Sequence, residues 1–357
     1  MKRTTRYFLL IACVALLSAC NKVSPLGVLI GGSGVEDRVK MSIQFFKNYE
    51  IQHFSDIYVD GPYSFLVGSD SHLTTDAGRL EEMFKIALDN DDVLMAHLGD
   101  IADTKAEYYI MLDSVMRWAK LDYVFKYYDW HYFDTLVPVD TTGAKANYDL
   151  LYFTKKEGDH EIKTYDDIQY PFYPVVGNHD ITHNGWALWS NIFGSSFYEI
   201  NVVDTVNKAV DHFVFLDSAN GTLGREQINA IEDGILDEEG KFAAGAEYEG
   251  YGSNYRYVFC FTHTNIFRPS SFQFASTFSR EETYFLLDLF SEWQASIVFM
   301  GHVHAWDERQ YGNAYYLTVD CMSESNNPEP GDYLVRVNVD DSDYDYEKVH
   351  MSYTPKK

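Results

Sequence analysis

The sequence predicts an α/β sandwich. Five short runs, rich in apolar, β-branched or aromatic residues, have the length and composition of buried strands. Between the first two runs, apolar residues recur at helical spacing, and the order strand, helix, strand favours parallel pairing of the two strands. A short polar cluster follows each run, and open α/β sheets gather their ligands at the carboxyl ends of their strands. A functional site is therefore expected at that edge.

The elements follow in chain order. The five strands are expected at 63–68, 93–98, 172–176, 257–261 and 296–300. The helix between the first two strands covers Asp76–Asn90, where Leu80, Phe84, Ala87 and Leu88 recur at helical spacing. Three glycines stand at strand exits, where a residue without Cβ lets the chain turn sharply and approach an ion closely. These glycines are Gly99, Gly177 and Gly301.

The polar clusters contain the side chains that bind metal ions. They read Ser-Asp-Ser-His at 69–72, Gly-Asp at 99–100, Gly-Asn-His-Asp at 177–180, Thr-His-Thr at 262–264 and Gly-His-Val-His at 301–304. Taken singly, each is more typical of a capping Asp or a core His bonded to backbone than of a metal ligand. Taken together, their oxygen and imidazole donors suit two divalent or trivalent first-row ions better than the thiolate sets of structural zinc.

The five clusters resemble the motifs of the calcineurin-like metallophosphoesterases, which read D-x-H, G-D, G-N-H-[DE], a lone His and G-H-x-H. All five are present in that order between about Tyr63 and Val319. The resemblance implies a four-layer sandwich of two facing mixed β-sheets flanked by helices. It also implies a pair of metal ions, with Mn, Fe or Zn as candidates.

The resemblance further implies which residues hold each ion. The first ion would be held by Asp70, His72, Asp100 and His304. The second would be held by Asp100, Asn178, His263 and His302, with the Asp100 carboxylate bridging the pair.

By the same resemblance, the chain is a phosphatase or phosphodiesterase whose nucleophile is a hydroxide that bridges the metals. His179 would act as general acid toward the leaving oxygen, and Asp180 would orient its imidazole, cap a helix, or do both. A different interpretation is a non-catalytic envelope lipoprotein that binds a phosphate ligand or a partner through this site. A third is an envelope scaffold or receptor in which the metals are structural.

Contacts to the substrate are less defined by the sequence. Asn178, His183 and Arg268 are the candidate contacts, and Trp186 and Trp189 are further candidates near the leaving group. A small phosphoester is expected as substrate, while the natural ester and the oligomeric state are left open.

The N-terminus resembles a bacterial lipoprotein signal. A basic start and the apolar run Tyr7–Leu17 precede the sequence Leu-Ser-Ala-Cys at 17–20, so residues 1–19 are predicted to be cleaved and Cys20 to carry lipid. The apolar run is too short to span a membrane. The other interpretation is an ordinary signal peptide. Asn21 after the cysteine favours the outer membrane of the bacterial cell envelope.

The rest of the chain is predicted to form one enlarged domain. With 357 residues and 46% hydrophobic content, it can bury a large core. The domain is expected at 60–340, with an aromatic-rich insertion at about 104–170 that either packs as a lid or stacks on substrate. A tether and lead-in segment at 20–59 precedes it, and an acidic tail at 341–357 follows.

The net charge limits the possible partners of the protein. Of 28 basic and 54 acidic residues, cleavage after residue 19 removes three basic ones, which leaves a formal charge of −29. Nucleic acid is therefore not an expected partner, whereas two cations would attract a small phosphate compound locally.

Cys260 and Cys321 are expected to be buried hydrophobic residues rather than a disulfide.

Overall fold

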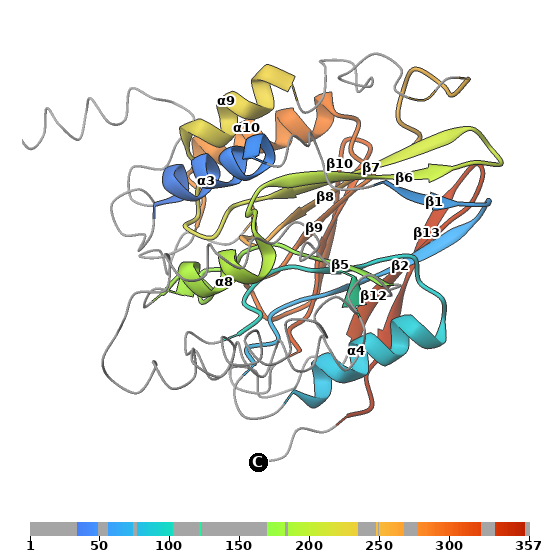
Figure 1. Cartoon of the computed structure of the whole chain (residues 1–357), viewed down its shortest axis with the longest axis horizontal. Helices are drawn as coiled ribbons and strands as arrows, with labels where there is room; N and C mark the ends of the chain where they lie inside the picture. Colours follow the sequence, from blue (N-terminus) through green and yellow to red (C-terminus); the bar gives the residue numbers. More distant parts are fainter. Residues whose placement is uncertain are drawn as a thin grey trace, which may run out of the picture.

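Two mixed β-sheets lie face to face in the computed structural model, with helices on their outer faces (Figure 1). The structure describes residues 34–48, 56–73, 77–102, 121–122, 170–182, 185–234, 248, 250–267, 277–322 and 333–353. The signal segment, Cys20, His183, Arg268 and all of the insertion except residues 121–122 and 170 lie outside these ranges.

One sheet has seven strands in the order β1-β6-β7-β8-β9-β11-β10. Its strands are β1 Ile57–Val59, β6 Tyr198–Asp204, β7 Ala209–Leu216, β8 Val258–Thr262, β9 Ile297–Met300, β10 Asp307–Tyr311 and β11 Ala314–Thr318. β7, β8, β9 and β11 pair in parallel, so the chain leaves these four strands at the same edge.

The other sheet has six strands in the order β13-β12-β2-β3-β5-β4. Its strands are β2 Tyr63–Gly68, β3 Met95–His97, β4 Leu121–Asp122, β5 Tyr170–Pro174, β12 Tyr333–Val339 and β13 Tyr344–His350. β2, β3 and β5 pair in parallel. The five strands expected from the sequence are β2, β3, β5, β8 and β9, and their positions agree with the prediction within a few residues.

An aromatic core fills the space between the sheets. Phe65 of β2 packs edge-on against Phe213 of β7 and Phe259 of β8, with ring centroids 5.0 Å away in both cases. Its ring also lies 6.4 Å from Phe261 and 6.2 Å from Phe299. All these side chains are fully buried. Aromatic edge-to-face packing of this kind fixes the position of one sheet against the other.

Helices complete the four layers, as predicted. The six-stranded sheet is covered by α4 Gly78–Asp89, which is the predicted crossover helix, and by α8 Gly185–Phe193. The seven-stranded sheet is covered by α3 Val35–Asn48, α9 Gly224–Gly234 and α10 Arg280–Glu292. No helix in the described ranges combines the length and apolar character that a membrane span requires.

The structure corrects the N-terminal domain boundary. Helix α3 lies in the predicted tether, yet its Arg38 makes a buried two-pronged salt bridge with Asp217, at 2.8 Å from Nε to Oδ2 and 2.7 Å from Nη2 to Oδ1. Both side chains are fully buried. Such a paired geometry compensates for the loss of water around two charges, so α3 belongs to the folded body.

The C-terminal boundary also changes. Residues 344–350, predicted as part of an acidic tail, form edge strand β13 with register Tyr333↔His350 to Val339↔Tyr344 on β12. Beyond it, Glu82 of α4 accepts hydrogen bonds from the backbone N–H groups of Ser352 and Tyr353 at 2.7 and 2.8 Å. The acidic side chains of this region are exposed, as expected from the sequence.

Candidate metal centre

The predicted ligands gather where strands of both sheets end. Asp70 and His72 follow β2, Asp100 follows β3, and Asn178 follows β5. From the facing sheet, His263 follows β8 directly, while His302 and His304 follow β9. Hydrogen bonds join the two sheets at this edge. The backbone N–H of His302 donates to Oδ2 of Asp70 at 2.9 Å, and Nδ1 of His263 lies 2.7 Å from the carbonyl oxygen of Leu98.

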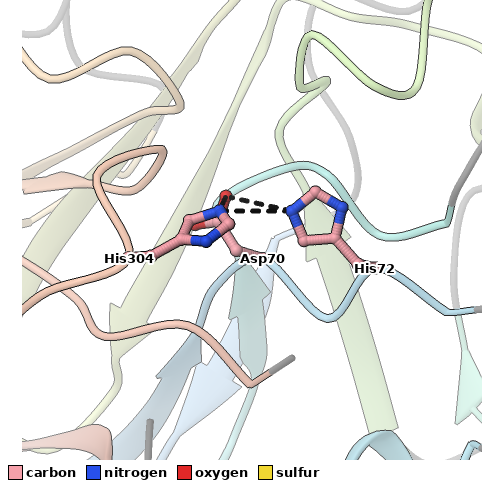
Figure 2. A group of neighbouring side chains, drawn as sticks. All are labelled: Asp70, His72 and His304. Carbon is pink, nitrogen blue, oxygen red and sulfur yellow. Dashed lines mark hydrogen bonds and ion pairs between the residues drawn. The ribbon is translucent and has the colours of Figure 1, made fainter. Parts of the chain in front are cut away.

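A first group consists of Asp70, His72 and His304, whose ligand atoms all lie within 4.8 Å of one another. Figure 2 shows both imidazoles directed at the Asp70 carboxylate. The Nε2 atoms of His304 and His72 lie 3.3 and 3.9 Å from Oδ1 of Asp70, and 3.2 Å from each other. Two imidazole nitrogens and one carboxylate oxygen converging in this way form a donor set suited to one first-row ion.

A second group consists of Asp100, His263 and His302, again within 4.8 Å. Asn178 adjoins it, since its Oδ1 lies 2.9 Å from Nε2 of His263. Oδ2 of Asp100 lies 3.4 Å from Nε2 of His263 and 3.8 Å from Nε2 of His72. A single carboxylate oxygen thus faces both groups, which is the position required of a bridging ligand.

His179 borders the first group. Its ring meets the ring of His72 edge-on at 4.6 Å, and its backbone N–H donates to Oδ1 of Asp100 at 2.7 Å. One ligand atom from each of His72, Asp100 and His179 also lies within 4.8 Å of the other two. The imidazole is therefore in place for the predicted general acid and equally for an additional ligand, two roles that a variant at this position separates.

The backbone conformation of the predicted ligands and the surroundings of one Asp70 oxygen are consistent with a metal ion at this site. Among the described residues, eight non-glycine residues have positive φ, and five of them are predicted ligands. These five are Asp70, His72, Asp100, His302 and His304, with φ between 40° and 70°. Left-handed backbone at non-glycine residues is strained and clusters at functional sites. In addition, Oδ1 of Asp70 is buried, and no group in the described part of the chain donates a well-aligned hydrogen bond to it, as is expected of a ligand atom.

Two glycines at strand exits make the close approach possible. A Cβ at Gly301 would lie 2.8 Å from Oδ2 of Asp70, and a Cβ at Gly177 would collide with the backbone nitrogen and Oδ1 of Asp100. Any side chain at either position would displace a predicted ligand. The requirement for glycine expected from the sequence is confirmed at both positions.

Mutual attraction between carboxylates and imidazoles dominates the electrostatics. Burial raises the pKa of Asp70, but His304 and His263 lower it to about 2. Burial lowers the pKa of both His263 and His304. The Asp100 carboxylate outweighs this effect and raises the pKa of His263 to about 9. Asp70 and Cys321 raise the pKa of His304 to about 10. The neighbouring carboxylates therefore favour the imidazolium forms of His263 and His304 in the metal-free protein. Ions that bind here must displace protons, so metal uptake releases acid.

Asp180, which is predicted to orient His179, cap a helix, or do both, binds the backbone of two loops. It is fully buried, and its carboxylate accepts backbone N–H bonds from the loops after β3 and β5. The donors are Asp100 and Gly177 at 2.8 Å, Ile101 at 3.1 Å and Ala102 at 3.4 Å. Burial and the nearby Asp100 charge raise its pKa to about 7. These bonds make Asp180 a positioning residue that ties two ligand-bearing loops together.

Trp186 and Trp189, the further candidates near the leaving group, are both buried. They lie in α8 and stack on each other at 5.5 Å, both buried in the layer between α8 and the six-stranded sheet. Their apolar area stabilises that layer. Cys260 and Cys321 are both buried and form no disulfide, as the sequence predicts.

No protein-family model matches the chain, and no curated protein matches it. Among solved structures, the anchor in the inner membrane complex of Plasmodium is similar at 13% identity and TM-score 0.46, covering 82% of this chain and 90% of its own. A dimetal phosphatase from Danio rerio is similar at 12% identity and TM-score 0.39, covering 82% and 100%. An archaeal phosphodiesterase is similar at 10% identity and TM-score 0.34, covering 80% and 99%.

Proposed function

We propose that this protein is a calcineurin-like metallophosphoesterase, which hydrolyses small phosphomonoesters or phosphodiesters with two metal ions. The observation that carries the proposal is the position of Asp100, whose Oδ2 faces His263 of one ligand group and His72 of the other. A site built for one structural ion would not need a shared carboxylate between two imidazole groups.

The ions and the side chains would divide the chemistry. When bound, a metal pair would lower the pKa of a water molecule and would neutralise negative charge on the phosphoryl oxygens of the substrate. Asp180 keeps the loops of Asp100 and Asn178 in register through backbone N–H groups. His179, only partly buried beside His72, would donate the proton that the leaving oxygen needs.

A panel of esters tests the proposal. Protein reconstituted separately with Mn, Zn or Fe is offered alkyl and aryl monoesters, diesters, nucleotides and phosphosugars, and release of phosphate or alcohol is followed. Turnover of at least one ester class that depends on added metal is the expected result. A protein that holds two ions and hydrolyses none of them would instead favour the non-catalytic lipoprotein.

The proposal includes a lipid anchor at Cys20, which would place the enzyme on the cell envelope, at the outer membrane. A domain of formal charge −29 is repelled by anionic lipid surfaces, so attachment would depend on acyl chains. Each buried CH₂ contributes about 0.8 kcal/mol, and several chains on one cysteine would make release negligible.

Cys20→Ser is therefore expected to abolish incorporation of labelled fatty acid. A variant that begins at Asn21 is expected to fractionate as a soluble protein with full activity, because every predicted ligand follows residue 69 and α3 begins at Val35. Membrane fractionation with labelled palmitate checks both results. Label that persists in the Cys20→Ser protein, or wild-type protein found wholly in the soluble fraction, would exclude the anchor.

A further inference from the structure

The loop after β7 lies directly beside the loop that carries His263. β7 and β8 are parallel neighbours with register His212↔Val258 to Leu216↔Thr262. The residues that leave β7 therefore lie next to those that leave β8. The loop after β7 contains no residue of the predicted ligand pattern, so the sequence predicts no role for it.

Ser218 makes a dense set of hydrogen bonds to this neighbouring loop. Its Oγ accepts from the backbone N–H of His263 at 3.1 Å and of Thr264 at 2.9 Å, and lies 2.6 Å from Oγ1 of Thr262. Its carbonyl oxygen accepts from Oγ1 of Thr264 at 2.6 Å. All four residues are almost completely buried. Bonds of this kind, made away from water, hold a backbone segment in one conformation.

Ser218 is itself held rigidly. The preceding residue, Asp217, is the partner of Arg38 in the buried salt bridge from α3. Its backbone N–H donates to Oε1 of Gln227 at 2.8 Å, and its carbonyl accepts from Nε2 of the same side chain at 2.8 Å. Helices α3 and α9 therefore fix the β7 exit, and Ser218 transfers that fixed position to the backbone of His263.

The imidazole of His263 completes the chain of contacts. Nδ1 is bound by the Leu98 carbonyl at 2.7 Å, which directs Nε2 toward Asn178 and Asp100. A histidine that ligates a metal depends on such partners for its ring orientation and tautomer. The ring is thus held by Leu98 and the backbone by Ser218.

We infer that Ser218 is a positioning residue for the second metal site, which acts by holding the backbone of His263 in the conformation that ligation requires. The inference rests on the proposed function, because it concerns the same metal pair. Ser218 touches neither ion nor substrate; its effect passes through His263.

The test is metal binding by Ser218→Ala, followed by titration with Mn²⁺ or Zn²⁺ and elemental analysis of dialysed protein. One of the two sites is expected to lose about 10–100-fold in affinity, while the other stays at the wild-type value. Ser195→Ala is the matched control, since Ser195 is equally buried and its Oγ bonds only the Phe197 backbone in the described part of the chain. Melting temperatures of the metal-free proteins separate a general loss of stability from a site effect.

If Ser218→Ala does not fold, Ser218→Cys takes its place, because a thiol keeps the approximate volume but accepts hydrogen bonds weakly. Wild-type affinity at both sites in the variant overturns the inference and leaves the proposed function standing. Two ions bound without ester hydrolysis in the wild type removes the proposed function, and the comparison of affinities still tests Ser218. A wild type that takes up no ion overturns both.

Discussion

Asp100→Asn is expected to weaken both metal sites at once and to reduce kcat/KM by about 10³-fold or more, because metal ions contribute several kcal/mol of transition-state stabilisation. The carboxylate is almost fully buried, and its Oδ2 is the atom that faces both His72 and His263. An amide has similar shape but no charge. Its oxygen can still accept the His179 backbone N–H that Oδ1 accepts at 2.7 Å, so the loop should stay folded.

His72→Ala provides the contrast, since this residue belongs to the first group and should chiefly empty one site. Asp211→Asn provides the control for the chemical change. Asp211 is another buried carboxylate, but it pairs with Arg256 at the opposite end of β7 from the metal centre. Elemental analysis after reconstitution decides the outcome. An Asp100→Asn protein with two tightly held ions, or a reconstituted wild type with none, would contradict the dinuclear arrangement.

The strands and ligand loops could be predicted from sequence because their signals are local. β2 was expected at 63–68 and begins and ends there. One face of its sheet packs on the other sheet and the other face packs on helices, so the strand is apolar on both faces. The polar residues directly after such strands are brought together by the parallel sheet itself. Residue types and spacing therefore carried both the fold class and the gathering of the predicted ligands.

Elements fixed by distant contacts were not predictable in this way. Helix α3 joins the body through Arg38 and Asp217, which lie 179 positions apart in the chain. The residues around Arg38 in the sequence do not indicate that Asp217 is its partner. Strand β13 was not predicted, because the acidic run at 340–347 is typical of a solvated tail. The alternating Tyr344 and Tyr346, which are more buried than Asp345 and Glu347, were a strand signal.

The backbone contacts of Asp180 and the role of Ser218 were not predicted for a related reason. Asp180 and Ser218 act on backbone N–H groups, which every residue except proline possesses. Sequence shows where such side chains stand but not which amides converge on them. Ligands can be recognised by their chemical type, whereas the residues that orient them are defined by geometry alone.

His179→Ala is expected to keep both ions and to lose about 10²–10⁴-fold in kcat toward esters with poor leaving groups. The imidazole lies beside His72 with ring centroids 4.6 Å apart, at the margin of the predicted metal pair. Proton donation matters most when the departing oxygen is strongly basic. An alkyl phosphate should therefore suffer most, and a nitrophenyl ester, whose oxygen departs as a stable anion, should suffer least.

The two measurements together distinguish the roles open to His179. Loss of an ion from the His179→Ala protein would mean that the group formed with His72 and Asp100 is a true ligand set. Retained ions with equal losses for alkyl and nitrophenyl esters would mean that the side chain holds the phosphoryl group instead of donating a proton. Only retained ions combined with a loss that grows with leaving-group basicity agree with a general acid, because the proton is then needed in proportion to the charge that develops on the departing oxygen.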